Sequence, residues 1–274
     1  MQRRTIFAAL LALAVAALPG RVVAQQRDTT GEGDRRFLRP TELALLGGGI
    51  AASGVLSIFD TRIARWTQSS SVQGDSSRRR LVERITKVNE STLTLAGLVF
   101  YGVGRISNNE MITDVAKHTT EAVVITSLIS QAMRGPLGRT RPYVTHDSDQ
   151  YNFQAGKGFT KFDNRSWPSL HSATAFAAGS ALVAEIRERH PDALPWAAPL
   201  IFGAAALPGL SRMYLDQHWA SDVLAGDIIG AVIGGRIVKY AHSAKPGDGP
   251  GWLVNATVSP SSEGGVLLGV SLQP

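Results

Sequence analysis

The sequence predicts an all-α protein, a helical bundle of about six helices with a small C-terminal β-hairpin. Three observations predict this class. Apolar stretches with helical spacing recur through the middle of the chain. β-prone stretches, at residues 252–258 and 266–272, occur only near its end. The 274 residues include no cysteine, so helix packing must hold the fold together without disulfides.

The expected long helices cover residues 43–59, 93–103, 113–133, 172–189, 195–207 and 219–240. Thr41 is the expected N-cap of the first helix, and Arg78, Arg79 and Arg80 are expected to begin a further helix after a Ser/Gly loop at 68–77. Residues 143–167 are rich in Asp, Asn, Gly and Lys, which predicts a long loop. Long loops inside compact domains often carry function.

The ends of the chain predict export and a distinct tail. Residues 1–24 have the basic start, apolar stretch and small residues of a signal peptide, and an uncleaved membrane anchor is the alternative. Residues 25–39 are an expected flexible leader, residues 40–242 the helical domain, and residues 243–274 a linker with the hairpin. We therefore expect an exported protein, periplasmic or associated with the membrane on its periplasmic face.

Charge and hydropathy limit the classes of partner. The net charge is +6, and the expected signal peptide supplies three of those charges, so the mature chain carries +3. This mild excess suits an anionic substrate or membrane surface and is too small to indicate nucleic acid. Most apolar stretches are shorter than the ~20 residues of a membrane span, which favours a soluble or peripheral domain over short, tilted spans. The sequence indicates no oligomeric state.

Two segments concentrate side chains suited to binding phosphate. Arg134 and Arg141, followed by Pro142, come directly after an apolar helix, and guanidinium groups pair bidentately with phosphate oxygens. Pro168-Ser169-Leu170-His171 lies where a loop becomes a helix, and a helix N-terminus favours an anion. A solvated helix end and a helix cap are the alternative readings of these two segments.

The third segment contains Ser211, Arg212, His218 and Asp222. The spacing of four between His218 and Asp222 places both side chains on one face of a helix. A carboxylate beside an imidazole fixes its tautomer and frees the other ring nitrogen for nucleophilic attack. The segment therefore predicts a nucleophilic histidine, with a surface His–Asp pair as the alternative.

Together the three segments resemble the motifs of the superfamily that joins type 2 phosphatidic acid phosphatases, bacterial non-specific acid phosphatases and vanadium-dependent haloperoxidases. Its motifs read Lys-x6-Arg-Pro, Pro-Ser-Gly-His and Ser-Arg-x5-His-x3-Asp. The third motif is matched in full, whereas Arg134 replaces the lysine of the first and Leu170 the glycine of the second. The resemblance covers roughly residues 90–240.

The resemblance implies a phosphatase acting on a phosphorylated lipid or small molecule through a phosphohistidine. It implies catalytic roles for His218 as the nucleophile, Asp222 as its orienting group and His171 as the acid and base. The phosphate oxygens would be bound by Arg134, Arg141, Ser169, Leu170 and Arg212. No metal ion or other cofactor is implied, and vanadate would act as an inhibitor.

Two further readings remain open. In a haloperoxidase the same pocket would hold vanadate as a prosthetic group. Alternatively, Arg134 and Leu170 could mark a catalytically weakened, membrane-associated scaffold that only binds phosphate. If the family glycine needs a positive φ, Leu170 would be strained there.

Overall fold

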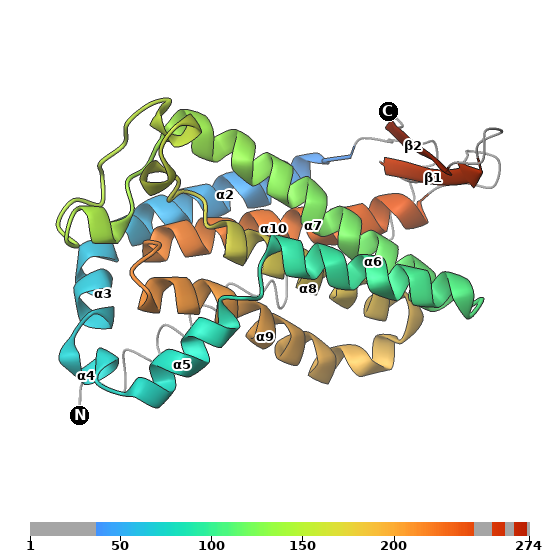
Figure 1. Cartoon of the computed structure of the whole chain (residues 1–274), viewed down its shortest axis with the longest axis horizontal. Helices are drawn as coiled ribbons and strands as arrows, with labels where there is room; N and C mark the ends of the chain where they lie inside the picture. The colour runs from blue at the N-terminus through green and yellow to red at the C-terminus, as the bar shows by residue number, and fades with distance from the viewer. Residues whose placement is uncertain (1–36, 244–253, 261–265, 273–274) are drawn as a thin grey trace.

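A computed structural model describes residues 37–243 and two strands, β1 (Val254–Pro260) and β2 (Val266–Leu272). The strands pair antiparallel with Val254 opposite Leu272. The expected signal peptide, nearly all of the leader and most of the linker lie outside the described residues. The predicted all-α class is confirmed for the body of the chain (Figure 1).

Nine α-helices form the described body. In chain order they are α2 (Pro40–Leu56), α3 (Asp60–Thr67), α4 (Ser70–Gln73), α5 (Ser76–Ile85), α6 (Glu90–Ile106), α7 (Glu110–Leu137), α8 (Leu170–Arg189), α9 (Leu194–Tyr214) and α10 (Ala220–His242). Six of them have at least 17 residues. The 32-residue connection between α7 and α8 contains three short 3-10 turns and an isolated β-bridge between Arg139 and Phe153.

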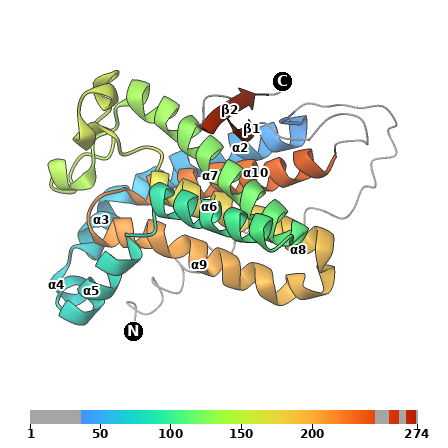
Figure 2. The ribbon, with the colours of Figure 1, turned by 45° about the vertical axis from the view of Figure 1, so that its right-hand side comes forward.

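The centre of the bundle is the contact between α8 and α10. Helix α10 also packs on α2 and α7 (Figure 2). Small residues allow the two backbones to approach closely, because a Cβ added at Gly230 would lie only 2.1 Å from the carbonyl oxygen of Ala173. Ala177 and Ala181 of α8 are fully buried against Ile233 of α10 in the largest apolar cluster.

Three local expectations were wrong. Helix α9 continues to Tyr214 instead of stopping at 207, since it accommodates Pro199 and Pro208 in its interior. The segment expected as a Ser/Gly loop contains α4 and the start of α5, whose N-cap Asp75 accepts hydrogen bonds from two backbone N–H groups. Thr41 is not the N-cap of α2, because Pro40 already occupies the first helical position and Arg39 caps it.

Two helical stretches are long and apolar enough to cross a membrane: Pro40–Thr67, which contains α2 and α3, and Pro191–Tyr214, which contains α9. The sequence predicted that most apolar stretches are shorter than the ~20 residues of a membrane span, and these two are longer. Only 11% and 28% of their most apolar windows are buried inside the protein. At about 1.5 Å per residue, the 21 residues of α9 extend roughly 31 Å.

Candidate active site

The three sequence segments meet at one end of the bundle, the left end in Figure 1. Here α7 ends, α8 and α10 begin, and α9 returns to α10. Gly138, at φ +62°, terminates α7 in the left-handed conformation and starts the connection that leads to α8. The predicted residues lie on these helix ends: Arg134 in the last turn of α7, Arg141 just after it, Ser169, Leu170 and His171 at the start of α8, Arg212 in the last turn of α9, and Asp222 in the first turn of α10.

His218 lies in the short connection just before α10, not within that helix as its spacing suggested. Its side chain still faces Asp222, with Nδ1 3.6 Å from Oδ2, slightly beyond hydrogen-bonding distance. Both side chains are buried. Because Nδ1 faces the carboxylate, Nε2 is the nitrogen available for attack. Catalytic hydrogen bonds are often long in free enzymes and shorten when substrate binds.

Asp222 is fixed by three hydrogen-bond donors. Its Oδ2 accepts from the backbone N–H of Trp219 at 2.9 Å and from the Ser166 hydroxyl. Its Oδ1 accepts from Nη1 of Arg139 at 2.6 Å, in a buried ion pair. Burial alone would raise the pKa of Asp222, but the charge of Arg139 and these hydrogen bonds lower it to about 2. Asp222 is therefore a carboxylate at neutral pH and can hold the Nδ1–H tautomer of His218.

Arg139 and Asp60 form a layer beneath His218 and Asp222 that the sequence motifs did not indicate as part of the site. Arg139 also donates to Asp60 Oδ2 at 2.8 Å and to the Ser221 hydroxyl at 2.7 Å. The backbone N–H of Ser221 donates to the other oxygen of Asp60. Asp60 comes from α3, 162 residues before Asp222, so no local spacing could have indicated this partnership.

Gln217 holds two of the predicted phosphate-binding arginines. Its Oε1 accepts from Arg141 Nη1 at 2.7 Å and from Arg212 Nη2 at 3.1 Å. The guanidinium of Arg141 also stacks on the Phe162 ring, 4.1 Å from its centroid. Both guanidinium groups thus meet at one oxygen of the residue next to His218. Gln217 occupies a variable position of the third motif, which gave no signal for it.

Arg134, where the family has lysine, is almost fully buried and donates from Nε to the carbonyl oxygen of Arg165 at 2.9 Å. A lysine ammonium lacks the planar fork of arginine, which can donate to a carbonyl oxygen from one edge and direct its remaining N–H groups at the site. Arg134 therefore supports the connection before α8 as well as adding positive charge near His218 and His171.

The start of α8 has the features of an anion site. Ser169 is the N-cap, is fully buried, and its hydroxyl has no hydrogen-bond partner among the described residues. Its backbone N–H donates to the carbonyl oxygen of Asp222, which fixes the start of α8 against α10. Leu170 is the first helical residue and does not have a positive φ, so the strain considered for this glycine-to-leucine exchange is absent.

Two histidines in this site are held neutral by their surroundings. Burial and the charges of Arg212 and Arg134 lower the pKa of His171 to about 4. Burial, followed by the charge of Arg141, lowers the pKa of His218 well below its usual value, although Asp222 opposes the shift. A neutral His218 is the nucleophilic form. A bound phosphate anion would offset the arginine charges and raise the pKa of His171, which favours its acid form.

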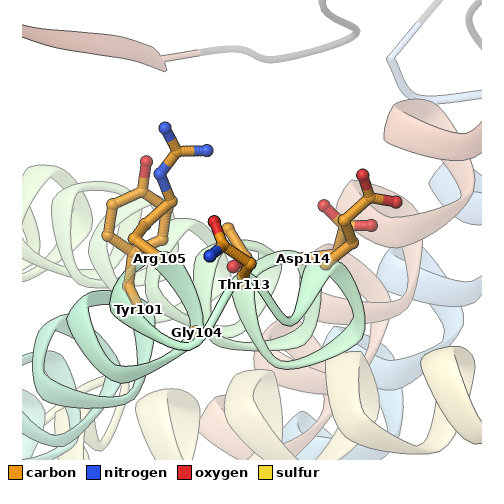
Figure 3. A pocket seen from close by; sticks show the side chains of 7 residues that line it. Tyr101, Gly104, Arg105, Thr113 and Asp114 are labelled. Carbon is orange, nitrogen blue, oxygen red and sulfur yellow. The ribbon is translucent and has the colours of Figure 1, made fainter.

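The other notable cavities and clusters lie elsewhere. A pocket of about 360 Å³ opens between α6 and α7 and is lined by Tyr101, Arg105 and Asp114 among others (Figure 3). Within residues 37–243, the His/Asp/Glu group with metal-ligand spacing consists of His118, Glu185 and His242. These residues are near the other ends of α7, α8 and α10, so neither feature belongs to the phosphate site.

Comparison with known proteins fits this arrangement. Residues 118–245, which include every predicted site residue, match the family model of the PAP2 superfamily. This match covers just under half of the chain. A lipid A 1-phosphatase of Porphyromonas gingivalis is 39% identical over 69 residues, 25% of this chain and 15% of that protein. A lipid A 1-phosphatase of Rhizobium johnstonii is 32% identical over 111 residues, 40% of this chain and 41% of that protein. The chain thus spans less than half the length of these relatives.

A solved structure shares the fold of this chain. It is the transmembrane PAP2-type phosphatidylglycerolphosphate phosphatase of Bacillus subtilis, with a TM-score of 0.52 and 18% identity. The similarity covers 75% of this chain and 96% of that one. It therefore extends beyond the residues matched by the family model to most of the helical body.

Proposed function

We propose that this PAP2 protein is a phosphatase that removes phosphate from phosphorylated lipids, as monoesters or pyrophosphates, through a phosphohistidine on His218. The observation that carries the proposal is the convergence of the His218–Asp222 pair, the Gln217-linked arginines and the start of α8. Phosphoryl transfer depends mainly on positioning and on stabilising negative charge, and this set supplies both. The reaction needs no metal ion, because arginines and backbone N–H groups supply the positive charge.

In the first step, Nε2 of His218 attacks phosphorus while the bond from phosphorus to the ester oxygen breaks. Asp222 stabilises the positive charge that develops on the imidazole. His171 donates its proton to the departing oxygen, so the lipid leaves as an alcohol. Arg141, Arg212 and the Ser169 hydroxyl bind the three equatorial oxygens of the transferring group.

In the second step, the now neutral His171 accepts a proton from water as the water oxygen attacks phosphorus. The nitrogen–phosphorus bond breaks, and its electron pair returns to His218. Inorganic phosphate leaves, and both histidines recover their starting protonation states. One histidine thus serves as acid and then as base, as microscopic reversibility requires for two opposite half-reactions.

A lipid substrate is supported by the surface of the bundle and by the relatives. Large apolar side chains are exposed along α2, α6 and α9; they include Leu45, Val55, Leu98, Phe100, Trp196 and Leu200. Large apolar side chains exposed in such number along helices indicate contact with lipid or with another protein. The curated relatives are named lipid A 1-phosphatases, which also act on a phosphorylated lipid.

We infer that α2 and α9 lie in the membrane and that the active site faces the periplasm from one end of the bundle. The two candidate spans are mostly unburied, and burying their apolar side chains in acyl chains would remove this surface from water. Fractionation tests this directly. The protein should stay in the membrane pellet after high salt and carbonate and be released by detergent, and release by salt alone would contradict the inference.

A substrate panel tests the activity. Purified protein in detergent, with EDTA present, should release phosphate from lipid A or phosphatidic acid faster than from p-nitrophenyl phosphate, and vanadate should inhibit it. His218→Ala should abolish turnover, whereas His190→Ala, an exposed histidine at the end of α8, should not change it. Full activity of His218→Ala would refute the mechanism. Peroxide- and halide-dependent bromination with added vanadate would instead indicate a haloperoxidase.

Acid-sensitive labelling tests the intermediate. Brief reaction with a substrate labelled in its phosphoryl group should leave label on the wild-type protein that is stable to base and lost in acid, as expected for a nitrogen–phosphorus bond. His218→Ala should carry no such label. Turnover without any trapped label, even under rapid quenching, would favour direct attack by water.

A further inference from the structure

Three potential metal ligands converge at the end of the bundle opposite the active site. They are His118 of α7, Glu185 of α8 and His242 of α10. The Nδ1 atom of His118 forms a short contact with Oε1 of Glu185, and Nε2 of His242 lies 3.1 Å from the same oxygen. All three ligand atoms lie within 4.8 Å of one another.

We propose that these three side chains form a Zn²⁺ site. Two imidazoles and one carboxylate are a common donor set for this ion, with bonds of about 2.0–2.2 Å. Tetrahedral ligands at such distances are roughly 3.3 Å apart, so the observed spacing needs only small side-chain movements to accept the ion. No local sequence motif contains the three ligands, and only the fold brings them together.

The buried and exposed side chains of this cluster fit a metal site with one coordination position open to solvent. His118 and Glu185 are 7% and 2% exposed, whereas the His242 side chain is 30% exposed. The ion could therefore enter from the solvent side, past His242. A water molecule would complete a tetrahedral shell on the same side.

A second layer of contacts orients the carboxylate. Nε of Arg189 donates to Oε2 of Glu185 at 2.9 Å, which leaves Oε1 directed at the two imidazoles. Arg189 in turn pairs with Asp114 Oδ2 at 3.1 Å, so its positive charge is offset by a second acid. Asp114 projects from α7 beside the pocket in Figure 3. Outer contacts of this kind commonly tune metal affinity.

The site is separate from the catalytic residues and does not rest on the proposed function. His118 precedes Arg134 by 16 residues on α7, which corresponds to about 24 Å along the helix. Glu185 follows His171 by 14 residues on α8, or about 21 Å. The ion would tie three helices together at the far end of the bundle and take no part in phosphoryl transfer.

Metal content and affinity test the proposal. Chain purified without a polyhistidine tag, stripped with chelator and reloaded, should bind one Zn²⁺ per molecule by mass spectrometry of the metal. Co²⁺ should give the visible absorption of a tetrahedral site. At a 100-fold excess over Kd, Zn²⁺ should raise Tm by roughly 5 to 10 °C. If the wild-type protein binds no Zn²⁺, the three side chains only hydrogen-bond to one another and the proposal is overturned.

Matched variants assign the binding to these residues. His118→Gln, Glu185→Gln and His242→Gln should each weaken binding by more than about 100-fold, and Arg189→Gln by about 10- to 100-fold. The control His190→Gln changes an exposed histidine at the same end of the bundle and should bind as the wild type does. His242 is the last residue of α10, so its variant is expected to fold, which circular dichroism checks. Unchanged affinity in His242→Gln would overturn the assignment.

Discussion

Arg139→Met removes the central cation of the layer beneath His218. In the wild type this side chain is 2% exposed and binds Asp222, Asp60 and Ser221 at 2.6–2.8 Å. Methionine keeps a similar length and apolar stem but has no donor. The carboxylates of Asp60 and Asp222, both fully buried, would lose their counter-charge.

The expected destabilisation follows from that loss. Removing one partner of a buried ion pair costs about 3–5 kcal/mol, because the remaining charge stays in a poorly solvated place. For a protein of this size, 1 kcal/mol corresponds to roughly 2–4 °C in Tm, so Arg139→Met should lower Tm by roughly 6 to 20 °C. The control Arg79→Met breaks an exposed pair with Glu83 on α5 and should lower Tm by less than about 4 °C.

Thermal unfolding in detergent, followed by tryptophan fluorescence, measures both variants. The Trp219 ring lies 5.7 Å from the Arg139 guanidinium and should report loss of this layer. Adding Asp60→Asn to Arg139→Met should restore part of the lost Tm, since one buried charge is then removed. If Arg139→Met unfolds within 4 °C of wild type, the layer does not stabilise the fold and the reasoning is refuted.

Three other predictions concern the reaction. Asp222→Asn should lower kcat by about 10⁴-fold with the fold retained, since the amide favours the wrong tautomer of His218; a loss below tenfold would count against its orienting role. Leu170→Gly should lower Tm and give no gain in rate, because it removes a buried side chain from an unstrained helical position; a large gain would indicate a weakened site. In the free protein His171 has a pKa of about 4 and must be protonated to act as the acid, so kcat/KM should fall as pH rises above that value; a rise between pH 5 and 8 would contradict this role.

The sequence predicts helices well where the apolar pattern is continuous and poorly where proline or polar residues interrupt it. Helices α7, α8 and α10 were expected within a few residues of their observed bounds. The predicted length of helix α9 was too short. A proline usually ends a helix, but α9 continues past Pro208 to Tyr214. The N-caps of α2 and α5 depend on hydrogen bonds between a side chain and backbone N–H groups, which spacing alone does not reveal.

The motifs identified the side chains of the candidate site but not what holds them. Gln217 is adjacent to His218 in sequence, yet its role depends on two arginines from other elements. Asp60 and Arg139 become partners only when α3 meets the start of α10. The cluster of His118, Glu185 and His242 was missed for the same reason, since 67 and 57 residues separate its members. Such long-range pairings are set by packing, which a single sequence does not display.

The contact between α8 and α10 has a consequence for how this site can vary. Gly226 faces the backbone of Ser169, where an added Cβ would lie 2.5 Å from its carbonyl oxygen, and Gly230 faces α8 one turn further along. These glycines therefore set the distance between α8, which carries His171, and the start of α10, beside which His218 lies. A methyl group at either glycine would push α8 and α10 apart and so move the proposed acid, His171, away from the proposed nucleophile, His218, without contacting either histidine. The spacing of the two histidines is thus set by residues that carry no reactive side chain.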